Sequence, residues 1–78
     1  MTEIKFDRPA QFGARGRNGY LTTTGIAIFD MGDGHFSEIH LHPLTSRGSV
    51  SEACRIPIRK TAIRALIAEL QKLNGEAP

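Results

Sequence analysis

The sequence predicts an α+β domain in which a small antiparallel sheet of three to four strands is followed by one C-terminal amphipathic helix. Two observations lead to this prediction. Residues 20–42 are rich in Thr, Ile and aromatic side chains and alternate with polar ones, which is typical of strands. Residues 60–74 repeat apolar side chains at helical spacing. Because the strands come first, we expect the helix to pack across one face of the sheet.

A β-hairpin is expected in the middle of the chain. Residues 20–30 and 35–42 are the two candidate strands, and the turn at residues 31–34 contains glycine where a positive φ is expected. Gly25 suggests a bulge or a bend in the first strand. Pro43 is expected to end the second strand.

Two further extended segments are expected at the ends of the sheet. Residues 1–12 allow a short strand that Pro9 breaks. Residues 54–58 place two isoleucines on one face, and Pro57 lacks an amide donor, so this strand lies at an edge or is about to finish. The residues between, 44–53, have the composition of a loop, with room for a short strand near Val50.

The helix is expected from Lys60 to Asn74. Thr61 is the candidate N-cap, Glu69 and Lys72 can pair across one turn, and Gly75 follows the last turn. Five large apolar side chains fall within an arc of about 120° at 100° per residue. They are Ile63, Leu66, Ile67, Leu70 and Leu73.

The 78 residues predict one domain, with residues 1–19 as a flexible basic arm and residues 75–78 as a disordered tail. A chain this short has a marginal core and Cys54 cannot form an internal disulfide, so we expect a homodimer. A lone cysteine fits a reducing compartment, no signal peptide or membrane span is recognisable, and a cytoplasmic protein is expected.

Charge is segregated along the chain although the net charge is only +2. Residues 18–46 carry three acidic residues and no Lys or Arg, whereas residues 47–64 carry five basic residues against Glu52. Residues 1–17 are also basic overall. Two basic segments that meet on one surface would form a phosphate-binding face, whereas ordinary solvated arginines are the alternative.

No chemistry of an enzyme is recognisable. The chain has no nucleophile elbow and no phosphate-binding or dinucleotide loop, so we expect neither catalysis nor a cofactor. His40 and His42 share a strand face with Glu38 and can in principle bind a metal, but a polar row is the preferred interpretation and no metal is expected. Cys54 beside Arg55 is interpreted as a packing residue rather than a reactive thiol.

A nucleic-acid interface is the function we expect. Arginine and lysine side chains can follow a phosphate backbone, and an exposed ring can stack on a base. Tyr20 is the preferred stacking residue, since Phe29 and Phe36 suit the core. The expected binding residues are Arg15, Arg17, Tyr20, Arg47, Arg55, Arg59 and Lys60.

The segment I-H-L-H-P-L-T-S-R-G, the strand I-P-I and the closing helix resemble the positive-cofactor-four family of transcriptional coactivators and their bacterial relatives. The resemblance covers roughly residues 20–74. It implies a curved sheet followed by one helix, two copies that form a groove, and binding of single-stranded DNA in the regulation of transcription. A protein-interaction or dimerisation module without nucleic acid is the alternative function. A ribbon-helix-helix repressor is disfavoured, since it needs a second helix after Gly75.

Overall fold

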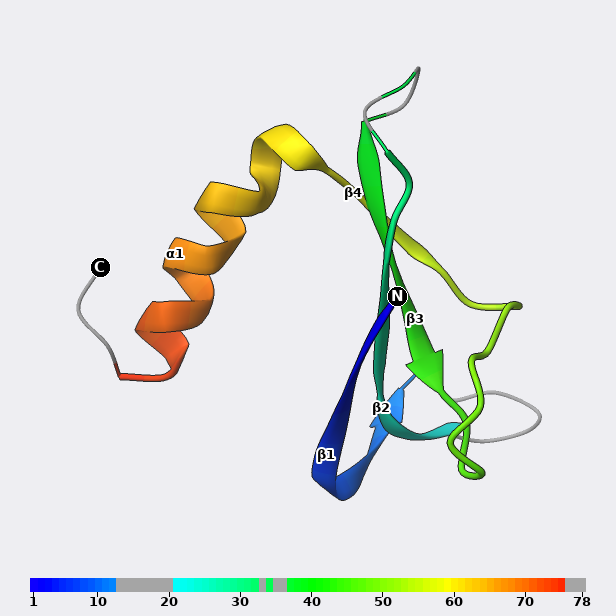
Figure 1. Cartoon of the computed structure of the whole chain (residues 1–78). Helices are drawn as coiled ribbons and strands as arrows, with labels where there is room; N and C mark the ends of the chain where they lie inside the picture. Colours follow the sequence, from blue (N-terminus) through cyan, green and yellow to red (C-terminus); the bar gives the residue numbers. More distant parts are fainter. Residues whose placement is uncertain (13–20, 33, 35–36, 76–78) are drawn as a thin grey trace.

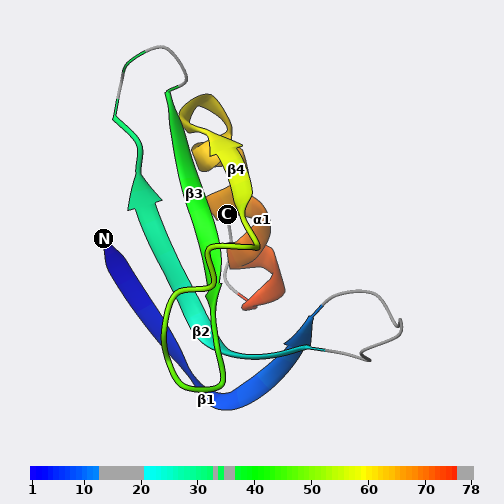
Figure 2. The same cartoon turned by 90° about the vertical axis from the view of Figure 1, so that its right-hand side faces the viewer.

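The computed structural model describes residues 1–12, 21–32, 34 and 37–75. Four strands form one antiparallel sheet in the order β1-β2-β3-β4, and one helix follows (Figures 1 and 2). This arrangement confirms the α+β prediction. The elements are β1 (Thr2–Phe12), β2 (Leu21–Asp30), β3 (Glu38–Leu44), β4 (Ile56–Arg59), the 3-10 helix η1 (Lys60–Ala62) and α1 (Ile63–Leu73).

The central hairpin of β2 and β3 is confirmed, and Gly32 adopts a positive φ of 85° in its connection. The expectation that Pro43 ends the second strand is wrong, because β3 continues to Leu44. The carbonyl oxygen of Pro43 accepts a hydrogen bond from the Ser51 amide, on the side away from β2. The N–H and C=O of a strand residue point the same way, so the missing donor of Pro43 does not interrupt the β2 ladder.

The N-terminal strand is longer than expected. β1 passes through Pro9 and reaches Phe12, because its pairing with β2 shifts register between Lys5 and Ala10. The residues in this irregularity are left out of the ladder, so proline removes no ladder bond there. Thr2–Phe12 of the expected arm are therefore an edge strand, and residues 13–19 lie outside the described residues, as do residues 76–78 of the expected tail.

The segment after β3 leads into the helix through a short strand. β4 pairs with β3 alone, so Pro57 does lie in an edge strand as its chemistry indicated. Val50 forms only an isolated bridge with Leu44. The prediction that Thr61 caps the helix is wrong, because η1 precedes α1 and Ala62 occupies the cap position with no side-chain hydrogen bond.

The end of the helix follows the expectation. Lys72 Nζ lies 3.3 Å from Glu69 Oε1, and Gly75 follows the last turn with a φ of 80°. α1 has 11 residues, and within the described residues no helix is long and apolar enough to cross a membrane.

Strand pairing gives the sheet two different faces. Residues that are paired across strands share a face, and residues alternate between faces along each strand. We define the polar face by Glu3, Lys5, Ala27, Phe29, Glu38, His40, His42 and Arg59. We define the apolar face by Ile4, Ile26, Ile28, Ile39, Leu41, Ile56 and Ile58.

The helix does not cover the sheet as expected. It leaves the end of β4 and extends away at an angle, on the side opposite the connection between β3 and β4 (Figures 1 and 2). Within the described residues, α1 makes no extensive contact with any strand. The prediction that the helix packs across one sheet face is therefore wrong for a single copy of the chain.

The buried core is correspondingly small. Among the described residues, only Ala27 and Leu44 are buried apolar side chains, and Thr23 and His40 are buried polar ones. Ala27 and His40 belong to the polar face, which the connection between β3 and β4 partly covers. Within the described residues, Ile4 and Ile56 of the apolar face and Leu66, Ile67, Leu70 and Leu73 of α1 remain exposed.

Candidate functional site

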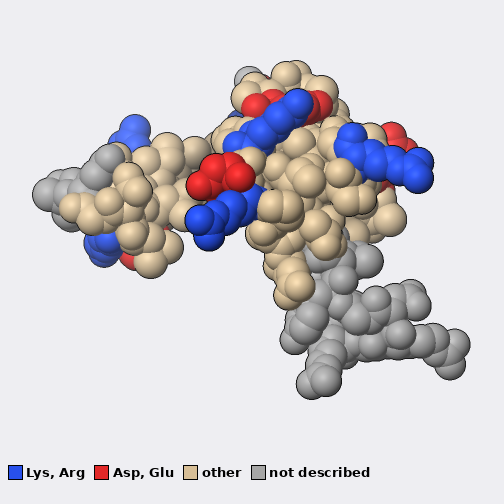
Figure 3. Space-filling view, turned by 90° about the horizontal axis from the view of Figure 1, so that it is seen from below, with Lys and Arg blue, Asp and Glu red and all other residues tan. Residues whose placement is uncertain are grey.

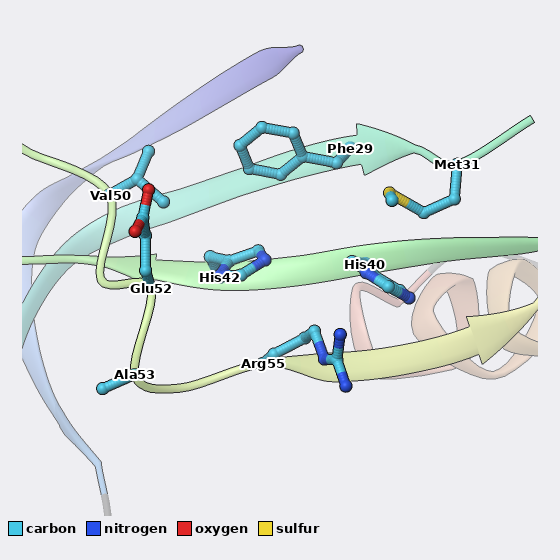
Figure 4. A pocket seen from close by; sticks show the side chains of 8 residues that line it. All are labelled: Phe29, Met31, His40, His42, Val50, Glu52, Ala53 and Arg55. Carbon is cyan, nitrogen blue, oxygen red and sulfur yellow. The ribbon is translucent and has the colours of Figure 1, made fainter.

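The polar face carries a hollow with a volume of about 690 Å³ (Figure 4). The strands supply Phe29, His40 and His42, while Arg55 stands just before β4. The connection between β3 and β4 supplies the opposite wall. The remaining lining residues are Met31, Val50, Glu52 and Ala53. The hollow therefore combines three aromatic rings and apolar side chains with one cation and one anion.

Two rings form the floor of this hollow. Phe29 and His42 lie on neighbouring strands with their centroids 5.1 Å apart and an interplanar angle of 74°, an edge-to-face contact (Figure 4). His42 Nδ1 lies 3.0 Å from the carbonyl oxygen of Ser51. Because a carbonyl oxygen only accepts, Nδ1 donates this hydrogen bond.

His40 is held by its neighbour on the same strand face. Its Nε2 donates to Glu38 Oε1 at 3.0 Å, which fixes the ring orientation, and the residue is only 8% exposed. The sequence placed Glu38, His40 and His42 on one face, and the strand pairing confirms this. Their side chains do not gather into a metal-binding group, and no group of three or more potential ligands exists among the described residues.

Two of the sequence-predicted binding residues lie on this face. Arg55 borders the hollow. Arg59 lies four residues later on the same side, because side chains alternate between the two faces along an extended segment. Arg47 is exposed in a turn after β3. In this turn the Gly48 amide donates a hydrogen bond of 2.8 Å to the carbonyl oxygen of Thr45. The described structure therefore brings Arg55 and Arg59 to one face, and places Arg47 in a separate turn.

Lys60 is placed differently. Its Nζ lies 2.8 Å from Asp30 Oδ1, and Asp30 is paired with Ile39 of the apolar face. The Lys60 ammonium and the Gly32 amide, which donates at 2.9 Å, hold the pKa of the Asp30 carboxyl below its usual value. Lys60 thus joins the end of β2 to η1. Arg15, Arg17 and Tyr20 lie outside the described residues.

The basic segments do not form one continuous positive surface on the face seen in Figure 3. The Lys and Arg side chains there are separated, and acidic side chains lie beside most of them. The same mixture holds on the polar face, where Glu38 is paired with Arg59 across the strands and Glu52 lines the hollow with Arg55. Segregation along the sequence therefore does not become segregation on this surface.

The hollow itself was missed by sequence reasoning. Phe29 was assigned to the core, although it is only half-buried and lines the hollow. The available signal was the alternation in the predicted hairpin, which places Phe29 and His42 on one face once the register is known. Cys54, interpreted as a packing residue, is half-buried and not disulfide-bonded.

Comparison with known proteins gives no further assignment. No protein-family model, no curated protein and no solved structure matches this chain.

Proposed function

We propose that this chain binds single-stranded DNA at the hollow on its polar face. The observation that carries the proposal is the juxtaposition of the Phe29 and His42 rings with the Arg55 guanidinium. A base stacks on the rings while Arg55 holds a neighbouring phosphate by charge-assisted hydrogen bonds. Stacking does not depend on base identity, since every base has a π-face, so binding without strong sequence preference is expected.

The neighbouring groups extend this site along the sheet. Arg59 lies on the same face and offers a second phosphate contact. The resemblance to the positive-cofactor-four coactivators supports DNA as the ligand and transcription regulation as the process. The free Cys54 thiol supports a reducing compartment, for which we propose the cytoplasm.

Anisotropy titration of a labelled oligo-dT of about 16 nucleotides at low salt tests the proposal. We expect Arg55→Ala to weaken binding about tenfold, the loss typical of one charge-assisted hydrogen bond. Phe29→Leu keeps an apolar side chain against His42 but removes the stacking ring, and should weaken binding similarly.

Arg64→Ala is the matched control, because it removes an exposed arginine from α1, away from the polar face. It should bind like the wild type. Absence of binding at micromolar protein in low salt contradicts the proposal. Equal losses in Arg55→Ala and Arg64→Ala would assign the binding to nonspecific charge rather than to this hollow.

A protein-interaction module without nucleic acid is the second candidate. The exposed apolar stripe of α1 favours it, because a large uncovered apolar surface marks an interaction site. Self-association or partner binding combined with no oligonucleotide binding in the same titration is the result that selects this candidate.

A further inference from the structure

The hollow on the polar face holds two opposite charges that are not paired with each other. Glu52 and Arg55 both line it, three residues apart on the connection between β3 and β4. Neither the carboxylate nor the guanidinium has a hydrogen-bond or ion-pair partner among the described residues. In Figure 4 the two groups extend on either side of the His42 ring. A ligand that lies on this ring therefore meets an acceptor on one side and a cation on the other.

The Glu52 carboxylate is unfavourable for a strand that is held by its phosphates alone. It lines the same hollow as the cation assigned to a phosphate, and like charges brought together in one site repel. A bound strand offsets this repulsion by bringing N–H donors to the carboxylate, because charge-assisted hydrogen bonds are strong. In DNA such donors occur only on the edges of the bases. Glu52 can therefore favour a base but not the backbone.

The bases differ in the donors that they offer to a carboxylate. Two adjacent donors fit its two oxygens with parallel hydrogen bonds. Guanine presents such a pair on its Watson–Crick edge, the ring N1–H and the N2 amino group. Adenine and cytosine present an amino group beside a ring nitrogen that only accepts, and thymine presents one N–H between two carbonyl oxygens. Guanine is therefore the base that best matches an unpaired carboxylate.

We propose that Glu52 selects guanine as the base that stacks in the hollow. The inference rests on the proposed function, which places a base on the Phe29 and His42 rings and a neighbouring phosphate at Arg55. The guanine N1–H and N2 amino group donate to the Glu52 oxygens, while its ring stacks on the floor. Stacking itself does not distinguish the bases, so the preference is confined to the nucleotide in the hollow.

Anisotropy titrations at low salt test this proposal with three labelled oligonucleotides of equal length. The first is oligo-dT, the second carries guanine at every fourth position, and the third carries hypoxanthine at those positions. The wild type should bind the guanine strand about fivefold more tightly than oligo-dT, the lower end for a bidentate contact, because Glu52 is exposed. Hypoxanthine lacks the N2 amino group, so its strand should bind with an affinity between the two.

Glu52→Gln gives a second readout, with changes of opposite sign. It removes a negative charge and should tighten the binding of oligo-dT about threefold. It should also abolish the guanine preference, because an amide cannot accept two parallel hydrogen bonds. A purely structural role of Glu52 would instead weaken both strands alike. Glu3→Gln is the matched control, since it removes an exposed carboxylate from the polar face outside the hollow and should keep the preference.

The outcomes separate this inference from the proposed function. Equal wild-type affinity for all three strands, or a guanine preference that persists in Glu52→Gln, overturns the selection by Glu52 and leaves single-strand binding standing. Absence of binding to every strand overturns both. Free dGMP carries the same edge and a phosphate, so it serves as an unlabelled competitor. If dGMP binds as tightly as the guanine strand, guanine selection is supported and the hollow belongs to a mononucleotide rather than to DNA.

Discussion

Gly25 lies where β1 approaches β2 so closely that a side chain has no space. It is buried and is paired with Lys5 on one side and Leu44 on the other. A Cβ at this position would collide with the carbonyl oxygen of Ile4 and lie 2.9 Å from Leu44 Cδ1. Its requirement is room, and the bulge or bend suggested at this place also occurs, because the pairing of β1 with β2 becomes irregular directly after the Lys5–Gly25 pair.

Gly25→Ala should destabilise the protein by about 1–3 kcal/mol, the range for overpacking, since backbone must move to admit the methyl group. Gly34→Ala is the control, because a Cβ there meets nothing within 4 Å. Urea denaturation of both variants and the wild type at one protein concentration gives the comparison. Equal midpoints for Gly25→Ala and the wild type would show that the strands separate without cost.

Prolines show how far single residues predict the fold. Pro57 was correctly placed in an edge or terminal strand, because its missing donor excludes a central position. Pro9 and Pro43 were wrongly expected to end strands. Whether a strand continues through Pro9 or Pro43 depends on which side of the strand is hydrogen-bonded and on where the register shifts. These features are set by the partner strand, so the local composition does not reveal them.

At the scale of elements, periodicity predicted the hairpin and the helix because both signals are local. The stripe of α1 was identified residue by residue, yet the position of the helix away from the sheet was not. The same five side chains serve a helix that covers its own sheet or one that joins two chains. The link between β4 and α1, which contains η1, decides between them, and nothing in the helical repeat specifies it.

The Asp30–Lys60 pair connects β2 to η1 and makes this link sensitive to acid. The pKa of Asp30 is lower in the folded chain than in the unfolded one, because Lys60 and the Gly32 amide favour the carboxylate. The pair therefore stabilises the fold fully above the unfolded pKa, near pH 4. That contribution is lost as the pH falls through the lower folded pKa.

Asp30→Asn should accordingly flatten the acid side of the stability profile. Between about pH 5 and about pH 3, the urea midpoint of the wild type should fall more than that of Asp30→Asn. The difference should be small because the carboxyl is exposed. Asp7→Asn, which removes an exposed carboxyl from β1, should follow the wild type. Parallel profiles for wild type and Asp30→Asn would mean that the pair does not hold η1 in solution.

For the whole molecule, recognising the candidate site required both the residue types, which the sequence gives, and the strand register, which it does not give directly. Arg55 and Arg59 were selected from the basic segment, and both lie on the polar face. Phe29 and His42 required the strand register to be recognised as one floor. Lys60 belongs to the same basic segment, but its ammonium contacts Asp30 on the other side of the sheet. Sequence position alone gives these three cations the same role.

Salt dependence separates those roles. Each phosphate contact to a single strand contributes a slope of about −0.7 in log affinity against log salt. Arg55→Gln should make the slope shallower by about 0.7, because one contact is lost. Lys60→Gln removes the same charge from the same segment but should leave the slope unchanged, since its ammonium lies at the Asp30 carboxylate rather than at the hollow. Circular dichroism should first show that both variants are folded. If Lys60→Gln changes the slope as much as Arg55→Gln does, the strand follows the basic segment as a whole, and the two-ring hollow is not what selects its path.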